Sequence, residues 1–195
     1  FNMTQKWPNF KRLHPNENHV KLNEVQLEDD EIALTVVRHP YSRFLSAFYH
    51  MVDACNSKFY YRNAPVSDCN TMKNMGINFD IFERDPNIFL MALNERTHPY
   101  HREANTIFNN FSIFKPQFYW VNNGKGKLHE KLKLILRQEN LEKEFLKVAR
   151  LLGHNPYWKK DNQRITKETK ELNSLSKSII RDIYAEDFRN FNFKY

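Results

Sequence analysis

The apolar positions near residue 35 change their spacing within a few residues. Residues 32–37 (IALTVV) are apolar on both faces, which is typical of a strand in the interior of a parallel sheet. From residue 42 onward the apolar side chains recur at helical spacing, and Pro40 suits the first position of a helix. The pattern therefore predicts a strand, a tight turn and a helix, which is half of a βαβ unit.

The rest of the chain mixes helical and strand-like patterns. Helical spacing recurs over three stretches, residues 79–94, 142–152 and 174–188. Strand-like runs occur in three others, residues 19–22, 114–121 and 132–136. Two polar stretches are expected to be irregular, residues 53–80 and 98–112. Because the chain has no internal repeat and no low-complexity linker, this order predicts one α/β domain over residues 1–195.

Composition excludes several classes of protein. The chain has 195 residues, of which 41% are hydrophobic and 14% aromatic, and this apolar content argues against intrinsic disorder. With only four glycines, neither G-x-x-x-x-G-K-[ST] nor G-x-G-x-x-G can be written anywhere. Two cysteines are too few for a disulfide scaffold and form no paired C-x-x-C zinc motif. No run approaches the roughly 20 apolar residues that cross a bilayer.

The net charge of +7 is unevenly distributed along the chain. Residues 121–170 hold 13 basic and 6 acidic side chains, whereas the basic and acidic side chains of the remaining residues balance. One interpretation is a solvated helix face followed by a basic loop. The other is a surface that attracts a polyanionic partner or a cofactor that carries phosphates. Charge alone does not choose between them.

Arg38 stands where chemistry is expected in an open α/β sheet. Ligands of such sheets bind beyond the carboxyl ends of the strands, close to helix N-termini. A guanidinium at that place can grip a phosphate through two hydrogen bonds, and Ser46, about two turns into the helix, can add a hydroxyl donor. The alternative is that Arg38 pairs with a structural carboxylate and that Ser46 is an ordinary surface serine.

Residues 38–48 (RHPYSRFLSAF) resemble the 3′-phosphate-binding segment of the Golgi-type carbohydrate sulfotransferases. Later segments resemble the same family in the same order, and the likeness spans residues 19–195. Residues 115–117 (KPQ) are similar to a Pro-Gln segment, and residues 136–141 (LRQENL) to a strand that ends in Arg-x-Glu-x-Leu. Residues 159–166 resemble a basic loop of the heparan sulfate 2-O-sulfotransferase branch, and residues 184–195 are like the family's closing aromatic pattern.

The resemblance implies a P-loop-kinase-like parallel sheet flanked by helices. It also implies an enzyme that moves a sulfuryl group from 3′-phosphoadenosine 5′-phosphosulfate to a carbohydrate hydroxyl by in-line displacement. Six residues are then expected to bind this co-substrate, namely Arg38, Ser46, Lys159, Lys160, Arg164 and Thr166. No metal is expected, because sulfuryl transfer needs positioning and positive charge more than covalent help from the protein.

A general base must take the proton of the acceptor hydroxyl. The 2-O-sulfotransferase branch uses a histidine in a His-Val context upstream of the phosphate-binding strand, and His19-Val20 matches that context. His14 is the rival, and a surface or packing histidine is the structural alternative for His19. Five further residues are candidates for acceptor binding, namely His98, His101, Arg102, Lys125 and Lys127.

The chain departs from the family pattern at its start. The family opens with a Lys-x-x-x-Thr-Ser loop around the 5′-phosphosulfate, and residues 1–30 contain nothing similar. We expect that loop upstream of Phe1, the alternative being a degenerate relative that no longer transfers sulfate.

Compartment and partners follow from the same resemblance. It implies the Golgi lumen for a eukaryotic protein, with a membrane anchor upstream of Phe1, and the cytoplasm is the alternative for a bacterial or viral one. Cys55 and Cys69 could pair in an oxidising lumen, and Asn2 and Asn110 begin glycosylation sequons, although two buried thiols and chance sequons are the alternative. The expected partner is an anionic polysaccharide.

Two competing functions remain open from the sequence. A non-catalytic module on the same fold, binding an anionic glycan or nucleic acid, is the main alternative, although no nucleic-acid partner is expected. A relative of the nucleotide kinases is disfavoured, because no Walker lysine and no acidic magnesium ligand is evident.

Overall fold

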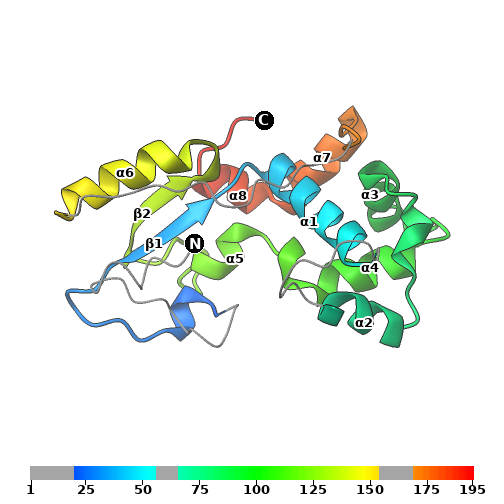
Figure 1. Cartoon of the computed structure of the whole chain (residues 1–195), viewed down its shortest axis with the longest axis horizontal. Helices are drawn as coiled ribbons and strands as arrows, with labels where there is room; N and C mark the ends of the chain where they lie inside the picture. The colour runs from blue at the N-terminus through cyan, green and yellow to red at the C-terminus, as the bar shows by residue number, and fades with distance from the viewer. Residues whose placement is uncertain (1–19, 56–65, 154–168) are drawn as a thin grey trace.

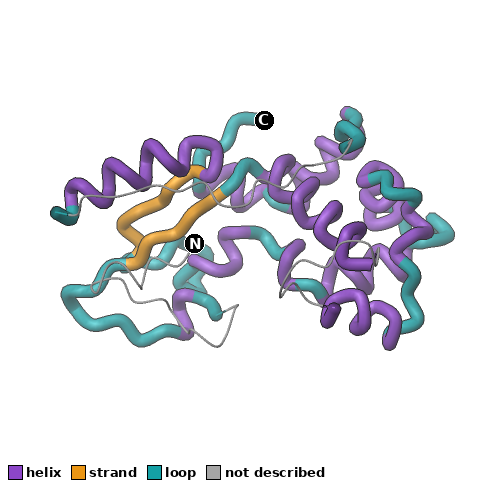
Figure 2. The backbone as a smooth tube through the Cα atoms, in the orientation of Figure 1, coloured by secondary structure: helices purple, strands orange, loops and turns teal. Residues whose placement is uncertain are grey.

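The computed structural model describes residues 20–55, 66–153 and 169–195. Its sheet consists of β1 (Ala33–Val37) and β2 (Leu132–Arg137), which run parallel with Val37 opposite Arg137 (Figures 1 and 2). Both strands were predicted from their apolar runs. The predicted class, α/β with a parallel sheet flanked by helices, is confirmed.

A helix follows each strand. β1 leads into α1 (Pro40–Cys55), and β2 leads through η4 (Gln138–Asn140) into α6 (Leu141–Leu151), which packs beside β2 in Figure 1. The other described elements are η1 (Leu22–Glu24), α2 (Val66–Asn74), η2 (Phe79–Phe82), α3 (Pro86–Asn94), α4 (His101–Asn110), η3 (Ser112–Phe114), α5 (Gln117–Val121), α7 (Ser174–Ile183) and α8 (Ala185–Asn190).

The turn from β1 into α1 is fixed by His39. The backbone N–H of Arg43 donates to the His39 carbonyl (2.8 Å), which closes the first helical turn. Nε2 of His39 lies 3.0 Å from the carbonyl oxygen of Lys194, so this nitrogen carries the hydrogen, and Nδ1 accepts from the N–H of Tyr41 (3.4 Å). Because Pro40 lacks an N–H, it leaves no donor unsatisfied at the first helical position.

The helix predicted over residues 79–94 is interrupted, and the proline is the reason. The chain forms η2, then Glu83 and Arg84 with positive φ of 51° and 55°, and then α3. Pro86 occupies the first turn of α3, and the Asp85 side chain accepts the N–H of Asn87 (2.9 Å), so the proline begins a helix instead of bending one.

Several segments that the sequence predicted as irregular or strand-like are helical in the structure. The polar stretch 98–112 contains α4, the stretch 53–80 contains α2, and residues 22–24 form the short helix η1 and not a strand. Residues 114–121, predicted as β-prone, form the end of η3 and all of α5. In α5 a distant carboxylate, Asp187, accepts the N–H groups of Gln117 and Phe118, so a tertiary contact overrides the strand propensity of the aromatic residues.

The core is aromatic and lies mainly among the helices. Phe44 and Phe48 of α1 contact Phe89 of α3 with ring centroids 6.1 and 5.9 Å apart, and Phe89 stacks on Phe114 at 5.5 Å. These four rings are fully buried or nearly so. Two apolar side chains of the strands, Val36 and Ile135, remain exposed, and so does Ile32 just before β1. The helices, and not the sheet, therefore bury most of the apolar surface of the described residues.

Tyr184 provides a test of this packing. Its hydroxyl donates to the carbonyl of Phe114 (2.7 Å), and both residues are fully buried. Burial also raises the pKa of the Tyr184 hydroxyl. We expect Tyr184→Phe to lower the free energy of unfolding by about 1–3 kcal/mol, because a buried carbonyl loses its donor. Tyr195→Phe, at a side chain exposed at the surface, is the matched control and should change it by less than about 0.5 kcal/mol in urea titrations.

Candidate functional site

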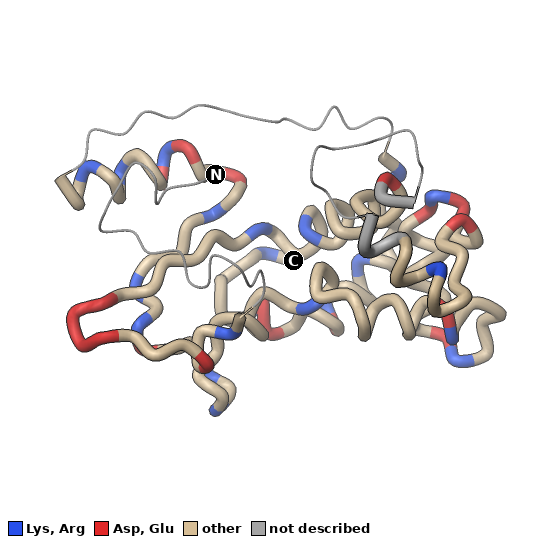
Figure 3. The backbone as a smooth tube through the Cα atoms, turned by 60° about the horizontal axis from the view of Figure 1, so that its bottom comes forward, with Lys and Arg blue, Asp and Glu red and all other residues tan. Residues whose placement is uncertain are grey.

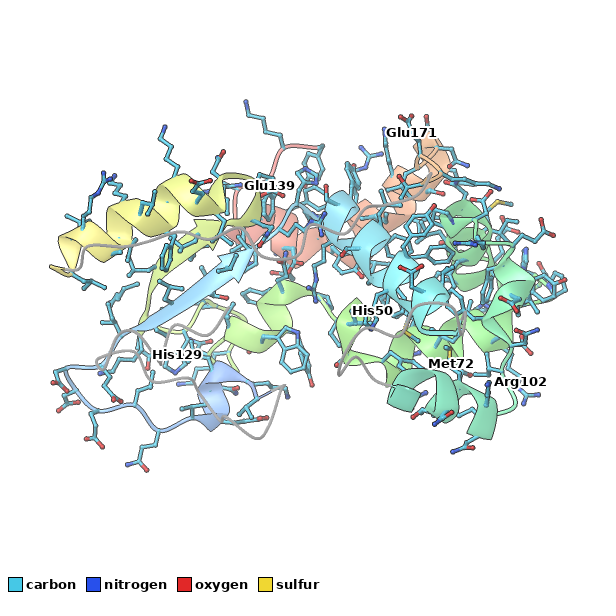
Figure 4. All side chains as sticks on the ribbon, in the orientation of Figure 1. His50, Met72, Arg102, His129, Glu139 and Glu171 are labelled. Carbon is cyan, nitrogen blue, oxygen red and sulfur yellow. The ribbon has the colours of Figure 1, made fainter. Side chains whose placement is uncertain are left out.

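The predicted site lies at the carboxyl ends of the two strands. Arg38 and His39 follow β1, and Arg137 ends β2 beside them. The N–H of His39 donates to Oε1 of Glu139 (2.7 Å), so the chain segments that leave the two strands are tied together. Glu139 is labelled in Figure 4 and marks this edge of the sheet. The acidic turn that precedes β1 lies at the opposite end of the strand (Figure 3).

The C-terminal residues cover part of this edge. A guanidinium nitrogen of Arg137 donates to the carbonyl of Phe191 (2.6 Å), and the same guanidinium lies 4.7 Å from the ring centroid of Phe193. The His39 ring lies 5.2 Å from the Phe193 ring and contacts Lys194 through Nε2. These contacts occupy Arg137 and His39 with structural partners, whereas no such contact is found for the Arg38 side chain among the described residues.

Among the described residues, the Arg38 side chain has no carboxylate as partner. Arg38 is half-buried, and within the described ranges its guanidinium forms no ion pair or hydrogen bond. The charge of Arg38 contributes to lowering the pKa of the Arg43 side chain, so the two cations influence each other. The structural alternative for Arg38 is therefore not realised among the described residues. A half-buried guanidinium near a second one, without an acidic partner in these ranges, suits the binding of an anion.

Ser46 lies in the second turn of α1. It is half-buried, and its hydroxyl has no hydrogen-bond partner in the part of the chain that the structure describes. Tyr49, three residues on and therefore close to the same helix face, accepts the backbone N–H of Lys170 through its hydroxyl (2.7 Å). Lys170 follows closely on the basic segment that contains Lys159 and Arg164. Lys170 itself is thus fixed on the side of α1 that carries Ser46.

Arg43 has a structural role that differs from that of Arg38. Its guanidinium is largely buried and donates to the carbonyl of Lys115 (2.7 Å). Burial lowers the pKa of the Arg43 side chain, and the neighbouring Tyr184 and Asp187 counteract this shift. Its Nε is buried without a hydrogen-bond partner. Arg43 thus joins α1 to the segment that precedes α5.

Gln117 and Asp187 form a buried polar network behind Arg38. The N–H of Arg38 donates to Oε1 of Gln117 (2.7 Å), and Nε2 of Gln117 donates to the Arg38 carbonyl (2.8 Å). Burial raises the pKa of the Asp187 carboxyl, whereas the N–H groups of Phe118 and Gln117 lower it. The sequence reasoning assigned neither residue a role, although both lie in segments whose patterns it noted, KPQ and the closing aromatic pattern.

Several predicted site residues fall outside the described residues. These are His14, His19, Lys159, Lys160, Arg164 and Thr166. The side chains of Cys55 and Cys69 are not described either, so their pairing stays a prediction. Of the residues next to His19, Lys21 places its ammonium 4.5 Å from the ring centroid of Tyr119 in α5. The described chain that follows His19 therefore packs beside the helix whose first residue holds Arg38.

The candidate acceptor-binding residues do not gather at Arg38. Nδ1 of His101 lies 2.9 Å from the carbonyl of Ala92, a contact that joins α4 to α3. Nδ1 of His98 accepts the N–H of Tyr100 (3.2 Å). Arg102 is exposed and lies at the opposite end of the molecule from Glu139 in Figure 4. Their role in acceptor binding stays a prediction.

Lys125 and Lys127 lie in the turn that precedes β2. The turn was predicted from Asn122-Asn123-Gly124, and the N–H of Asn123 donates to the carbonyl of Lys127 (2.8 Å). Both lysines are exposed. Because they precede β2 while Arg38 lies at its far end, they are separated from Arg38 by the length of the strand, about 16 Å at roughly 3.3 Å per residue.

Part of the basic excess lies on α6. Lys143, Lys147 and Arg150 line a hollow along this helix together with Asn140, Glu144 and Leu151. The two lysines and the arginine are exposed. Glu144 is occupied, because it accepts the N–H of Arg137. The positive charges of this face are therefore available to an anionic partner.

Two searches of the described residues gave no candidates. Within residues 20–55, 66–153 and 169–195, no group of three or more His, Cys, Asp or Glu side chains is arranged to hold a metal ion. None of the helices in these ranges is long and apolar enough to span a membrane.

Comparison with known proteins gave one match. A family model described as "Sulfotransferase family" matches residues 2–194. Searches of curated proteins and of solved structures gave no significant match. The matched residues include both strands and all the elements around Arg38.

The different environments of the two arginines predict different effects on stability. Arg43→Met removes the donor of a partly buried carbonyl and the largely buried cation beside Asp187, so we expect the free energy of unfolding to fall by about 2–4 kcal/mol. Arg38→Met removes a side chain without a described partner and should change it by less than about 1 kcal/mol. Urea unfolding followed by circular dichroism measures both, and equal losses would mean that Arg38 has a structural partner.

Proposed function

Because the chain belongs to the sulfotransferase family, we propose that it transfers a sulfuryl group from 3′-phosphoadenosine 5′-phosphosulfate to a hydroxyl of an anionic, glycosaminoglycan-like polysaccharide. The observation that carries the proposal is the guanidinium of Arg38 at the carboxyl end of β1, which has no partner among the described residues. In parallel α/β sheets this is where phosphate-bearing ligands bind, beside the N-terminus of the next helix.

The residues around Arg38 fit the 3′-phosphate of this co-substrate. The guanidinium can donate two hydrogen bonds to phosphate oxygens, and the free hydroxyl of Ser46 can donate a third. The neighbouring Arg43 adds positive charge near Arg38, and the N–H groups of the first turn of α1 add the positive end of the helix dipole. We assign Lys159, Lys160, Arg164 and Thr166 to the same co-substrate, because the chain that follows them is fixed on α1 through Lys170.

The co-substrate supplies the activated sulfuryl group when it is bound. His19 is the proposed general base and accepts the proton of the acceptor hydroxyl, a task that suits an imidazole near neutral pH. The packing of Lys21 on Tyr119 supports this assignment, since it brings the neighbouring chain to α5 and thus towards Gln117 and Arg38.

We assign the basic face of α6 to attraction of the acceptor. Lys143, Lys147 and Arg150 recur every three or four residues and span about 10 Å along the helix, a length over which an extended polyanion presents several charges. Lys125 and Lys127 extend the positive surface. For a eukaryotic protein we place this reaction in the Golgi lumen.

Nucleotide affinity tests the assignment of Arg38 and Ser46. We expect Arg38→Ala in the full-length protein to weaken binding of 3′-phosphoadenosine 5′-phosphate about 100-fold, since two charge-assisted hydrogen bonds are lost. Ser46→Ala should weaken it about tenfold. Arg96→Ala, at an exposed arginine outside the site, is the control. Titration calorimetry measures the three affinities, and an unchanged affinity in Arg38→Ala contradicts the proposal.

Sulfate transfer tests the general base. We expect His19→Ala to lower kcat by about 10²–10⁴-fold, the range typical of a lost general base, without weakening the binding of 3′-phosphoadenosine 5′-phosphate. The assay follows labelled sulfate from the co-substrate to a glycosaminoglycan acceptor. His14→Ala is the matched variant. Near-normal turnover of His19→Ala together with inactive His14→Ala transfers the role to His14.

A further inference from the structure

Gln117 holds the peptide groups on both sides of the Arg38 Cα atom. Its Oε1 accepts the Arg38 N–H at 2.7 Å, and its Nε2 donates to the Arg38 carbonyl at 2.8 Å. Arg38 lies just beyond the last residue of β1, so neither group belongs to the strand ladder. The two bonds fix the backbone at the position from which the guanidinium leaves the sheet.

The orientation of this amide is itself fixed. Nε2 of Gln117 also lies 3.3 Å from Oδ2 of Asp187, and the Gln117 N–H donates to the same oxygen at 2.9 Å. Oδ1 of Asp187 accepts the N–H of Phe118 at 2.7 Å. Both hydrogens of the amide thus meet acceptors and its oxygen meets a donor, so a flipped amide would face two acceptors with its oxygen. Gln117 and Asp187 are buried, which excludes competing water.

We infer that Gln117 is a positioning residue for the nucleotide, which sets the Arg38 guanidinium for the 3′-phosphate through the Arg38 backbone. The inference rests on the proposed function, because it takes Arg38 as the phosphate ligand. A guanidinium grips phosphate through two parallel hydrogen bonds, and this geometry tolerates little rotation of the residue that carries it. Gln117 itself is enclosed by protein and takes no part in binding.

The test compares two nucleotides that differ only in the 3′-phosphate. We expect Gln117→Met in the full-length protein to weaken binding of 3′-phosphoadenosine 5′-phosphate about tenfold or more, and that of adenosine 5′-monophosphate less than about twofold. Gln138→Met, at an exposed glutamine just beyond β2, is the matched control and should change neither affinity. An equal loss for both nucleotides, or no loss, overturns the inference.

Two further variants separate a loss of Arg38 positioning from a general loss of folding. Gln117→Asn keeps an amide beside Asp187 but is one methylene too short to reach Arg38, so it should show the same selective loss even if Gln117→Met does not fold. In an Arg38→Met background, Gln117→Met should cause no additional loss of affinity, because the residue through which it acts is gone. Additive losses contradict the inference.

The nucleotide preference of the wild-type protein distinguishes a failure of the proposed function from a failure of the role of Gln117. If the wild-type protein does not prefer the nucleotide with the 3′-phosphate, the proposed function fails and the role of Gln117 fails with it. If the wild-type protein shows the preference and Gln117→Met retains it, the function stands and the positioning role is wrong.

Discussion

The buried carboxylate of Asp187 organises the centre of the molecule. It accepts the N–H groups of Gln117 and Phe118 and orients the Gln117 amide, which in turn holds Arg38. Asp187 belongs to α8, Gln117 begins α5, and Arg38 lies between β1 and α1. One carboxylate therefore joins the C-terminal helices, the middle of the chain and the end of the strand. A buried charge is tolerated only where hydrogen bonds and a counter-charge compensate it, and the N–H groups and Arg43 provide both.

The two arginines of the β1–α1 segment show how position decides the role of a side chain. Arg43 is buried among protein acceptors and anions, and its charge is used to hold α1 against the chain that precedes α5. Arg38 is five residues away and lacks such partners among the described residues. Since both are cations, Arg43 also raises the electrostatic potential at Arg38. The positive charge of Arg43, which strengthens the fold, thus also makes the surroundings of Arg38 more favourable for an anion.

The sequence predicted the parts of the structure that depend on local patterns. The run over residues 32–37 and the spacing that follows it predicted β1 and α1, because a change of apolar period is visible within a few residues. The strand character of 114–121 was misleading, because the conformation of α5 depends on a carboxylate about 70 residues away. Helix α4 was missed because its stretch is mostly polar, and few apolar positions, among them the buried Ala104 and Ile107, mark the face that packs. Arg38 and Ser46 were proposed as site residues from their motif. The contact between Gln117 and Asp187 arises only on folding, because the two residues lie 70 positions apart in the chain.

This separation has a consequence for how the protein is made. Residues 38, 117 and 187 must all be present before the backbone at the end of β1 is fixed, so a chain whose synthesis has not reached residue 187 cannot assemble it. Contacts between residues so far apart in sequence form late, after the loops between them have been closed. Arg38, the proposed phosphate ligand, therefore reaches its final setting only late in folding, which would make nucleotide affinity a reporter of the finished fold.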